Sequence, residues 1–375
     1  MVRVFVSLLF ALVLCGQLPA QPPPPGTDAK QRSKAIRELA KQGSESIPKI
    51  TPYLADSDLP VRIEAVKALV DIGTQYSLEP LIKASQDSDP EMQIRATDGL
   101  VNFYLPGYVK TGLSGSLRRA GTVIKGKFTD TNDQIVDAYV EVRPDVVEAL
   151  GKVARGGSSM DSRANAARAI GVLRGRAAIP DLLAALHSKD TEVIYEALIA
   201  IEKIRDPSTG KDITFLLRDM DDKVQTTALD ATGLLRNLSA APQVRDVLEH
   251  ARSAKVRRQA LATLAMLPEE GNRPYLARYF NSKDDVLRAA SAEGYGRLKN
   301  PSDIQMLAKA FNSESKMNPR LALAFALVDD GKTDMSEFSP LRYLVNTLNS
   351  KGYQGVAQAY LVELARSPQI LQALY

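Results

Sequence analysis

The sequence predicts an all-α protein in which about nine helix pairs stack into an α-solenoid. The first observation behind this prediction is an apolar pattern that recurs about every 31 residues along the chain. The second is composition: the chain is 45% hydrophobic, yet it is only 6% aromatic and has no Trp, a balance typical of helices packed closely through small side chains. A lone helix pair cannot bury its apolar stripe, and stacking on neighbouring pairs achieves that burial.

Residues 1–20 have the pattern of a signal peptide. A short positive start ending at Arg3 precedes a nearly unbroken apolar run over residues 4–14, which has the length of a signal-peptide core and is too short to span a bilayer. Cleavage after Ala20 would place a small residue where signal peptidase requires one. We therefore predict export to the periplasm or the extracellular space, with a buried N-terminal helix as the alternative.

Cys15 is the single cysteine of the chain, and it offers a second route to a membrane. The surrounding LVLCG resembles a lipobox, but Leu14 stands where a lipoprotein signal has a small residue, so lipid attachment is the less favoured alternative. Cleavage after Ala20 would leave a mature chain with neither a disulfide nor a thiolate nucleophile. Residues 21–28, QPPPPGTD, read as a linker stiffened by prolines.

Val61 opens the clearest copy of the repeated helix. Ala65, Ala68 and Leu69 follow it at offsets of 4, 7 and 8, which places all four side chains on one face of a 3.6-residue helix. The same offsets recur from Met92, Ser162, Val193, Val224, Val256, Leu287, Pro319 and Tyr353. The steps between these anchors are 31, 70, 31, 31, 32, 31, 32 and 34 residues. Unrelated helices do not produce so constant a step, so the helix is copied.

A second helix precedes the copied one in most units. A proline lies 12 to 14 residues before the anchor at Pro48, Pro80, Pro180, Pro242 and Pro274, and proline favours the first turn of a helix. A helix over 29–43 forms an N-terminal cap. The predicted organisation is therefore a cap helix and repeats over 29–104, an insertion over 105–142, and repeats with a C-terminal cap over 143–375.

These residues resemble HEAT repeats, of the short type first described in phycobilisome-lyase-like proteins. The family pattern has an Asp in the turn, then Val-Arg, two alanines and a Leu, and the stretch from Asp58 to Leu69 matches it. The resemblance covers residues 44–104 and 143–365, and it implies an armadillo-like superhelix, here in an exported bacterial protein. It also implies that the arginine after each anchor ties neighbouring units together, at Arg62, Arg163, Arg257, Arg288 and Arg320.

The insertion at 105–142 breaks the 31-residue period and is basic. Its candidate partner-binding residues are Arg118, Arg119, Lys125 and Lys127. Leu113, Leu117, Ile124 and Phe128 recur there at helical spacing, so the segment could lie on an anionic membrane or bind an acidic partner. The alternatives are an apolar face packed against the repeats, with the charges in water, or a β-hairpin in GTVIKGKFTD. Long insertions often carry function.

Offsets 3, 6 and 10 from each anchor should face the concave side of the superhelix. They carry mixed charge in the first half of the chain. In the second half they place Met266, Arg297 and Phe325 on this face, with Met266 and Phe325 as exposed apolar spots. Such a surface suits a protein or peptide partner.

Composition and motifs disfavour most catalytic classes. The 48 basic and 44 acidic residues nearly balance, unlike the basic excess of nucleic-acid binders. His187 and His250 each end a predicted helix, where a histidine interacts with the helix dipole. Metal-ligand spacings and phosphate loops are absent from the sequence. We therefore predict no cofactor, no small-molecule substrate and no enzymatic activity.

The predicted function is an exported scaffold that binds a protein or peptide through its concave face or its basic insertion. Two alternatives remain. The resemblance allows a phycobilisome-lyase-like enzyme that attaches or isomerises a cofactor. The insertion, or an acylated Cys15, allows a peripheral membrane protein.

Overall fold

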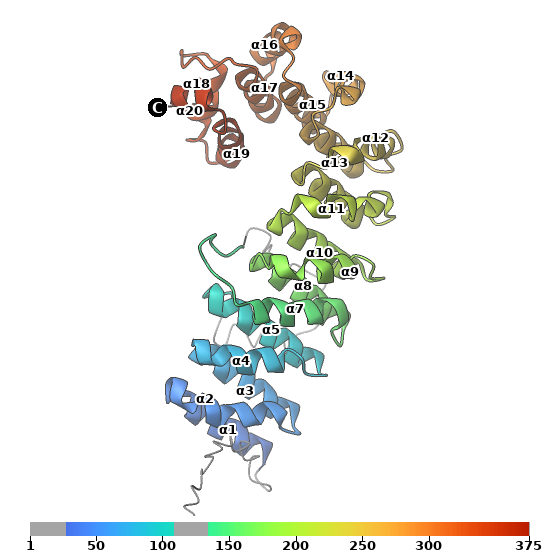
Figure 1. Ribbon diagram of the computed structural model, residues 1–375. Coiled ribbons are helices and arrows are strands. Elements are labelled where there is room, and N and C mark those ends of the chain that lie inside the picture. The colour runs from blue at the N-terminus through green and yellow to red at the C-terminus, as the bar shows by residue number, and fades with distance from the viewer. Residues whose placement is uncertain (1–27, 109–133, 375) are drawn as a thin grey trace, which may run out of the picture.

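The computed structural model describes residues 28–108 and 134–374. Within these ranges it contains α-helices and short 3₁₀ helices and no strand, which confirms the all-α prediction. The helices form one elongated, curved stack that runs from α1 at one end to α18, α19 and α20 at the other (Figure 1). The predicted leader over 1–20 and most of the linker over 21–28 lie outside the described residues.

The copied helices form one continuous row, here called the inner row, in which each member packs on the next. Its members are α1 (Ala29–Ala40), α3 (Leu59–Ile72), α5 (Pro90–Tyr104), α8 (Met160–Val172), α10 (Thr191–Ile204), α11 (Asp222–Leu234), α13 (Ala254–Met266), α15 (Asp285–Leu298) and α17 (Met317–Asp329). The side chains of Val61 and Val193 are fully buried, as the repeat pattern predicts for anchor positions.

The preceding helices form the outer row. Its members are α2 (Ile47–Ile50) with its flanking 3₁₀ turns η1 (Gly43–Ser46) and η2 (Thr51–Ala55), α4 (Gln75–Ala84), α7 (Pro144–Gly156), α9 (Ile179–Ala185), α12 (Ala241–Glu249), α14 (Arg273–Tyr279), α16 (Ile304–Ser313) and α18 (Pro340–Thr347). Between α10 and α11 the outer element is a pair of 3₁₀ turns, η4 (Pro207–Lys211) and η5 (Thr214–Arg218). Ile213, Leu216 and Leu217 bury the apolar side of that pair.

Local capping explains where the inner helices begin. The side chain of Asp89 accepts hydrogen bonds from the backbone N–H groups of Glu91 and Met92, and the turn aspartates before α10, α11 and α15 cap those helices in the same way. Such caps satisfy N–H groups that lack an intrahelical partner.

The prolines behave as predicted in four of the five positions. Pro48, Pro180, Pro242 and Pro274 lie in the first two positions of α2, α9, α12 and α14. Pro80 does not, because α4 begins at Gln75 and contains Pro80 in its interior. Leu78, Pro80 and Leu81 are buried there, and this packing outweighs the missing backbone hydrogen bond.

The arginines after the anchors connect neighbouring units in three of the five predicted cases. Arg62 lies 3.4 Å from Asp87 of the next unit, and Arg288 lies 2.9 Å from Glu314. Arg320 lies over the ring of Tyr343 in the next unit, in place of an ion pair with an aspartate. Arg163 donates to the Ala154 carbonyl in its own unit, so the prediction is wrong there. The structure shows no such link for Arg257.

The last unit departs from the stack. Tyr353, predicted as a ninth buried anchor, is a half-buried residue that precedes α19 (Gln354–Leu364). In the bent part of the stack α12 and α14 lie on the outside of the curve, while α19 lies on the inside, with α20 (Pro368–Leu374) behind it (Figure 1). The C-terminal helix therefore reaches the face that the repeats present to the concave side.

Candidate functional site on the inner face

The residues predicted to bind a partner fall into two groups. Arg118, Arg119, Lys125 and Lys127 lie outside the described residues. Met266, Arg297 and Phe325 lie on α13, α15 and α17, toward the inside of the curve.

The prediction that Phe325 and Arg297 form part of an exposed surface is wrong. Phe325 is fully buried, and the side chain of Arg297 is only 8% exposed. The physical reason is α19, which returns from the end of the stack and covers both residues. Periodicity places the two side chains on the correct face of their helices, but it carries no information about a helix that arrives from farther along the chain.

Arg297 is held by two carboxylates beneath α19. Its Nε lies 3.0 Å from Glu363 Oε1 and its Nη2 lies 2.9 Å from Glu363 Oε2. The remaining nitrogen, Nη1, lies 3.0 Å from Glu293 Oε2. Tyr360 of α19 donates to the other oxygen of Glu293 at 2.6 Å, and its ring stacks on Phe325 with 4.8 Å between centroids.

Charge pairing sets the ionisation of this cluster. Burial alone would raise the pKa of Glu363, but hydrogen bonds and the positive charges of Arg297 and Arg236 outweigh it and lower the pKa to about 2. Burial raises the pKa of Tyr360 well above its ordinary value, and the charge of Glu293 adds to that shift. Glu363 is therefore an anion, and Tyr360 a hydrogen-bond donor, across the physiological pH range.

Met266 is half-buried and packs against α11. Its sulfur lies 2.9 Å from the point that a Cβ of Gly233 would occupy. The Met266 carbonyl accepts a 3.5 Å hydrogen bond from Arg236. Met266 therefore contributes mainly to packing between units and leaves only part of its side chain to a partner.

The inner face of the first half is also less open than its sequence predicts. Arg168 and Glu196 form a buried ion pair with 2.5 Å between Nη2 and Oε1. Beside them, the Val136 N–H donates to the Val172 carbonyl at 2.9 Å, and Lys203 Nζ donates to the Gln134 carbonyl at 3.3 Å. The described end of the 105–142 insertion thus crosses the ends of α8 and α10, where a mixed-charge surface was expected.

Between these two covered regions, α10 and α11 hold a buried acidic pair. Burial raises the pKa of Glu202 well above its ordinary value, and the nearby Asp230 raises it further, against the opposing charges of Lys203 and Arg205. Glu202 Oε1 has no hydrogen-bond partner in the described part of the chain. Burial also raises the pKa of Asp230, although Gln259 donates to it at 3.1 Å.

A row of basic residues marks the C-terminal ends of the inner helices, and we call it the basic edge. It consists of Arg174, Arg205, Arg236 and Lys299, which are exposed and have φ angles of 52°, 54°, 53° and 52°. Each lies 12 residues after its anchor, where the units starting at Val61 and Pro319 have Gly73 and Gly331. The prediction missed this row, and alternation of Gly with Arg or Lys at one repeat position was the signal that could have found it.

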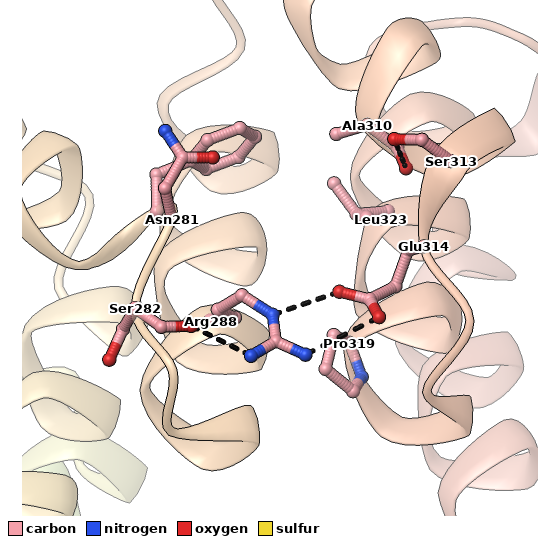
Figure 2. A pocket seen from close by; sticks show the side chains of 9 residues that line it. Asn281, Ser282, Arg288, Ala310, Ser313, Glu314, Pro319 and Leu323 are labelled. Atoms are coloured by element: carbon pink, nitrogen blue, oxygen red, sulfur yellow. Dashed lines mark hydrogen bonds and ion pairs between the residues drawn. The ribbon is translucent and has the colours of Figure 1, made fainter.

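A shallow pocket of about 330 Å³ opens at the seam between two other units. Figure 2 shows Arg288 of α15 there, between the Ser282 carbonyl and the Glu314 carboxylate. The arginine donates to Ser282 O at 2.7 Å and to Glu314 at 2.9 and 3.3 Å. All three guanidinium nitrogens are thus in use, so the pocket contains a structural link between units.

The remaining polar groups form no catalytic constellation within residues 28–108 and 134–374. No group of three or more His, Cys, Asp or Glu side chains there could hold a metal ion. His187 stacks on Phe215 with 4.8 Å between ring centroids, and His250 Nδ1 lies 3.2 Å from Asp246. In the same ranges no helix combines the length and apolar character that crossing a membrane requires.

The fold defines an α-solenoid whose inner row presents equivalent positions unit after unit. The family model of HEAT repeats matches residues 26–101, 147–233, 211–296 and 241–328, together more than half of the chain. The chain therefore belongs to the HEAT-repeat family.

Similarity to individual proteins is more distant. Over 190 residues, covering 45% of this chain and 74% of the relative, the chain is 26% identical to the bilin biosynthesis protein PecE of Nostoc sp. (strain PCC 7120). Among solved structures, YibA of E. coli is 15% identical with a TM-score of 0.47, covering 81% of this chain and 98% of that one. The complex of CpcE and CpcF of phycocyanin lyase from Nostoc sp. PCC7120 is 17% identical with a TM-score of 0.36, over 89% of this chain and 98% of that one. Likeness at these scores carries no argument about function.

Proposed function

We propose that this chain is an exported, non-enzymatic scaffold that binds a protein partner along its inner face. The observation that carries the proposal is the interaction of Arg236, on the basic edge, with Glu363 of α19. This contact, between residues 127 positions apart, shows that the inner face can bind an acidic helix that is not one of its repeats. Equivalent positions of neighbouring units remain exposed.

Two regions are the proposed contact surfaces. The first is the basic edge at α8 and α10. The second is the insertion, whose Arg118 and Lys125 lie outside the described residues. Export is proposed from the N-terminal sequence, which combines a positive start, a short apolar core and a small residue at the cleavage point.

Site-specific photo-cross-linking tests the proposal. A photoreactive amino acid is placed at Arg205 on the basic edge or at Arg118 in the insertion, and at Lys152 and Lys309 as controls. The two lysines are exposed on the outer helices α7 and α16. In the cells that produce the protein, we expect adducts of defined mass from Arg205 or Arg118 and none from the lysines. Adducts at equal yield from all four positions, or from none, would contradict the scaffold.

The similarity to PecE favours one alternative, a role in bilin chemistry. If the chain binds or transfers a bilin, the purified protein should acquire visible absorbance when it is incubated with a linear tetrapyrrole. A protein that stays colourless, while its cross-links persist, would support the scaffold over the lyase-like enzyme. Flotation with anionic liposomes, compared for the parent chain and a variant with Arg118, Arg119, Lys125 and Lys127 replaced by Gln, tests peripheral membrane binding.

A further inference from the structure

Three consecutive units hold an arginine where the backbone favours glycine. Arg174, Arg205 and Arg236 lie in the left-handed region directly after α8, α10 and α11. This position usually belongs to glycine, because an L side chain is strained there. Gly73 and Gly331 occupy it in two other units with φ angles of 59° and 97°. Because ending the helix does not require arginine, the guanidinium itself is the feature that needs an explanation.

Arg236 shows what such a guanidinium can do. Its Nη2 lies 2.9 Å from Oε1 of Glu363, a residue presented by α19. The same carboxylate is bound by Arg297 of α15. One arginine of the basic edge, with help from the inner helices, is therefore an occupied carboxylate-binding site.

Arg174 and Arg205 occupy the equivalent position without such an occupant. Both are exposed, and in the described ranges their side chains make no ion pair or hydrogen bond. Glu202 is close enough to Arg205 to feel its charge, but it is buried between α10 and α11 and does not pair with it. The two guanidinium groups thus point to an anion from outside the chain.

We propose that Arg174 and Arg205 bind two carboxylates of an acidic helix from a protein partner, in the way that Arg236 binds Glu363. This inference rests on the proposed scaffold function and specifies the chemistry of the partner. Guanidinium and carboxylate form short, charge-assisted hydrogen bonds. The internal occupant is a glutamate on a helix, which favours a helical, acidic partner over other anions.

The geometry also sets the spacing of the two acids. Arg174 and Arg205 end adjacent inner helices, and packed helices lie about 8–10 Å apart. A helix rises 1.5 Å per residue, so acids at positions i and i+7 lie about 10.5 Å apart on nearly the same face. Acids at positions i and i+4 are separated by only about 6 Å. The i, i+7 pair therefore matches the two arginines.

Designed peptides test this proposal with the full mature chain. The probe is a fluorescent, alanine-based helical peptide with two glutamates seven residues apart, and the comparison peptide has the same composition with the glutamates four residues apart. By fluorescence anisotropy, we expect the first peptide to bind about tenfold more tightly, because it engages both arginines at once. Equal affinity of the two peptides, or no binding of either, would overturn the proposal.

Variants assign the binding to the basic edge. R174Q/R205Q should remove the preference for the i, i+7 peptide, whereas K152Q/K309Q on the outer row should leave it unchanged. R174G/R205G provides a second test, because glycine suits the backbone at both positions and the variant should melt no lower than the parent chain. Retained preference in either arginine variant contradicts the proposal.

Competing occupants give distinct results. Binding of anionic vesicles or of a single-stranded oligonucleotide that exceeds peptide binding and disappears in R174Q/R205Q would overturn the acidic-helix assignment. A dimer in analytical ultracentrifugation that dissociates in the same variant would make a second copy the occupant, and would also overturn it. Cross-links at Arg205 without any spacing preference would leave the scaffold standing and remove only this inference.

Discussion

Asp330 follows the last residue of α17, and its ionisation is displaced by its surroundings. Burial, together with the nearby charges of Asp329 and Asp303, raises its pKa from 3.8 to about 7, although Lys299 opposes the shift. Its Oδ2 is buried and has no hydrogen-bond partner in the described ranges. The fold therefore favours the protonated form. The stabilisation from this group is complete below about pH 4 and is lost as the pH rises through 7.

We predict that D330N raises the melting temperature at pH 8 but leaves it nearly unchanged at pH 4. The amide keeps the shape of the protonated acid and cannot ionise, so it removes the penalty of a charged group in this position. Thermal unfolding followed by circular dichroism over pH 4 to 8 measures the effect. D212N, at an exposed aspartate, is the control and should leave the profile unchanged. An equal shift at every pH would contradict the prediction.

At the same scale, Arg297 shows the limit of pattern reasoning. Its position in the repeat predicts the face on which it lies, but its partners Glu363 and Tyr360 belong to α19. Glu363 is 66 residues away along the chain. Contacts of this separation leave no periodic mark in the sequence, so the ionic cluster could not be predicted.

The inner helices approach one another closely where glycine or alanine replaces larger side chains. A Cβ on Gly296 of α15 would lie 2.5 Å from the Cα of Ala326 on α17. Gly171 of α8 has the same relation to Ala200 of α10, at 2.8 Å. The repeat pattern predicts small residues at these seams, while the closeness of the two backbones is visible only in the structure.

We predict that G296A lowers the free energy of unfolding by about 1–3 kcal/mol, because the added methyl forces α15 and α17 apart. G156A at the end of α7 is the matched control, since a Cβ there meets nothing within 4 Å. It should be neutral or raise stability by a few tenths of a kcal/mol, through the better helix propensity of alanine. Chemical denaturation measures both variants. Equal effects would mean that backbone propensity, and not close packing, dominates at the seam.

The whole molecule is a stack in which each unit contacts chiefly its neighbours, so its stability need not be uniform. The first units pack in the regular manner, whereas the last ones are covered by α19. Phe325 lies at the centre of this covered region, fully buried and stacked against Tyr360. Its role is therefore structural, and damage there should spread through the C-terminal units first.

We predict that F325A destabilises the C-terminal units by about 3–5 kcal/mol, the usual loss when a buried phenylalanine becomes alanine. Hydrogen exchange measured by mass spectrometry should show lost protection from α15 to α20 and little change from α1 to α5. V362A serves as a control, because Val362 lies on α19 but is 60% exposed. A uniform loss of protection along the chain would show that the stack unfolds as one unit.

The sequence by itself determined the repeating architecture, the buried anchors and four of the five proline-marked helix starts. Those features depend on residues within one unit, where a 3.6-residue period decides which side chains face the core. Only the tertiary structure decided which part of the inner face stays open. Residues 134–136 cross α8 and α10, and α19 covers α15 and α17. Both contacts join distant segments whose meeting depends on the curvature of the whole stack.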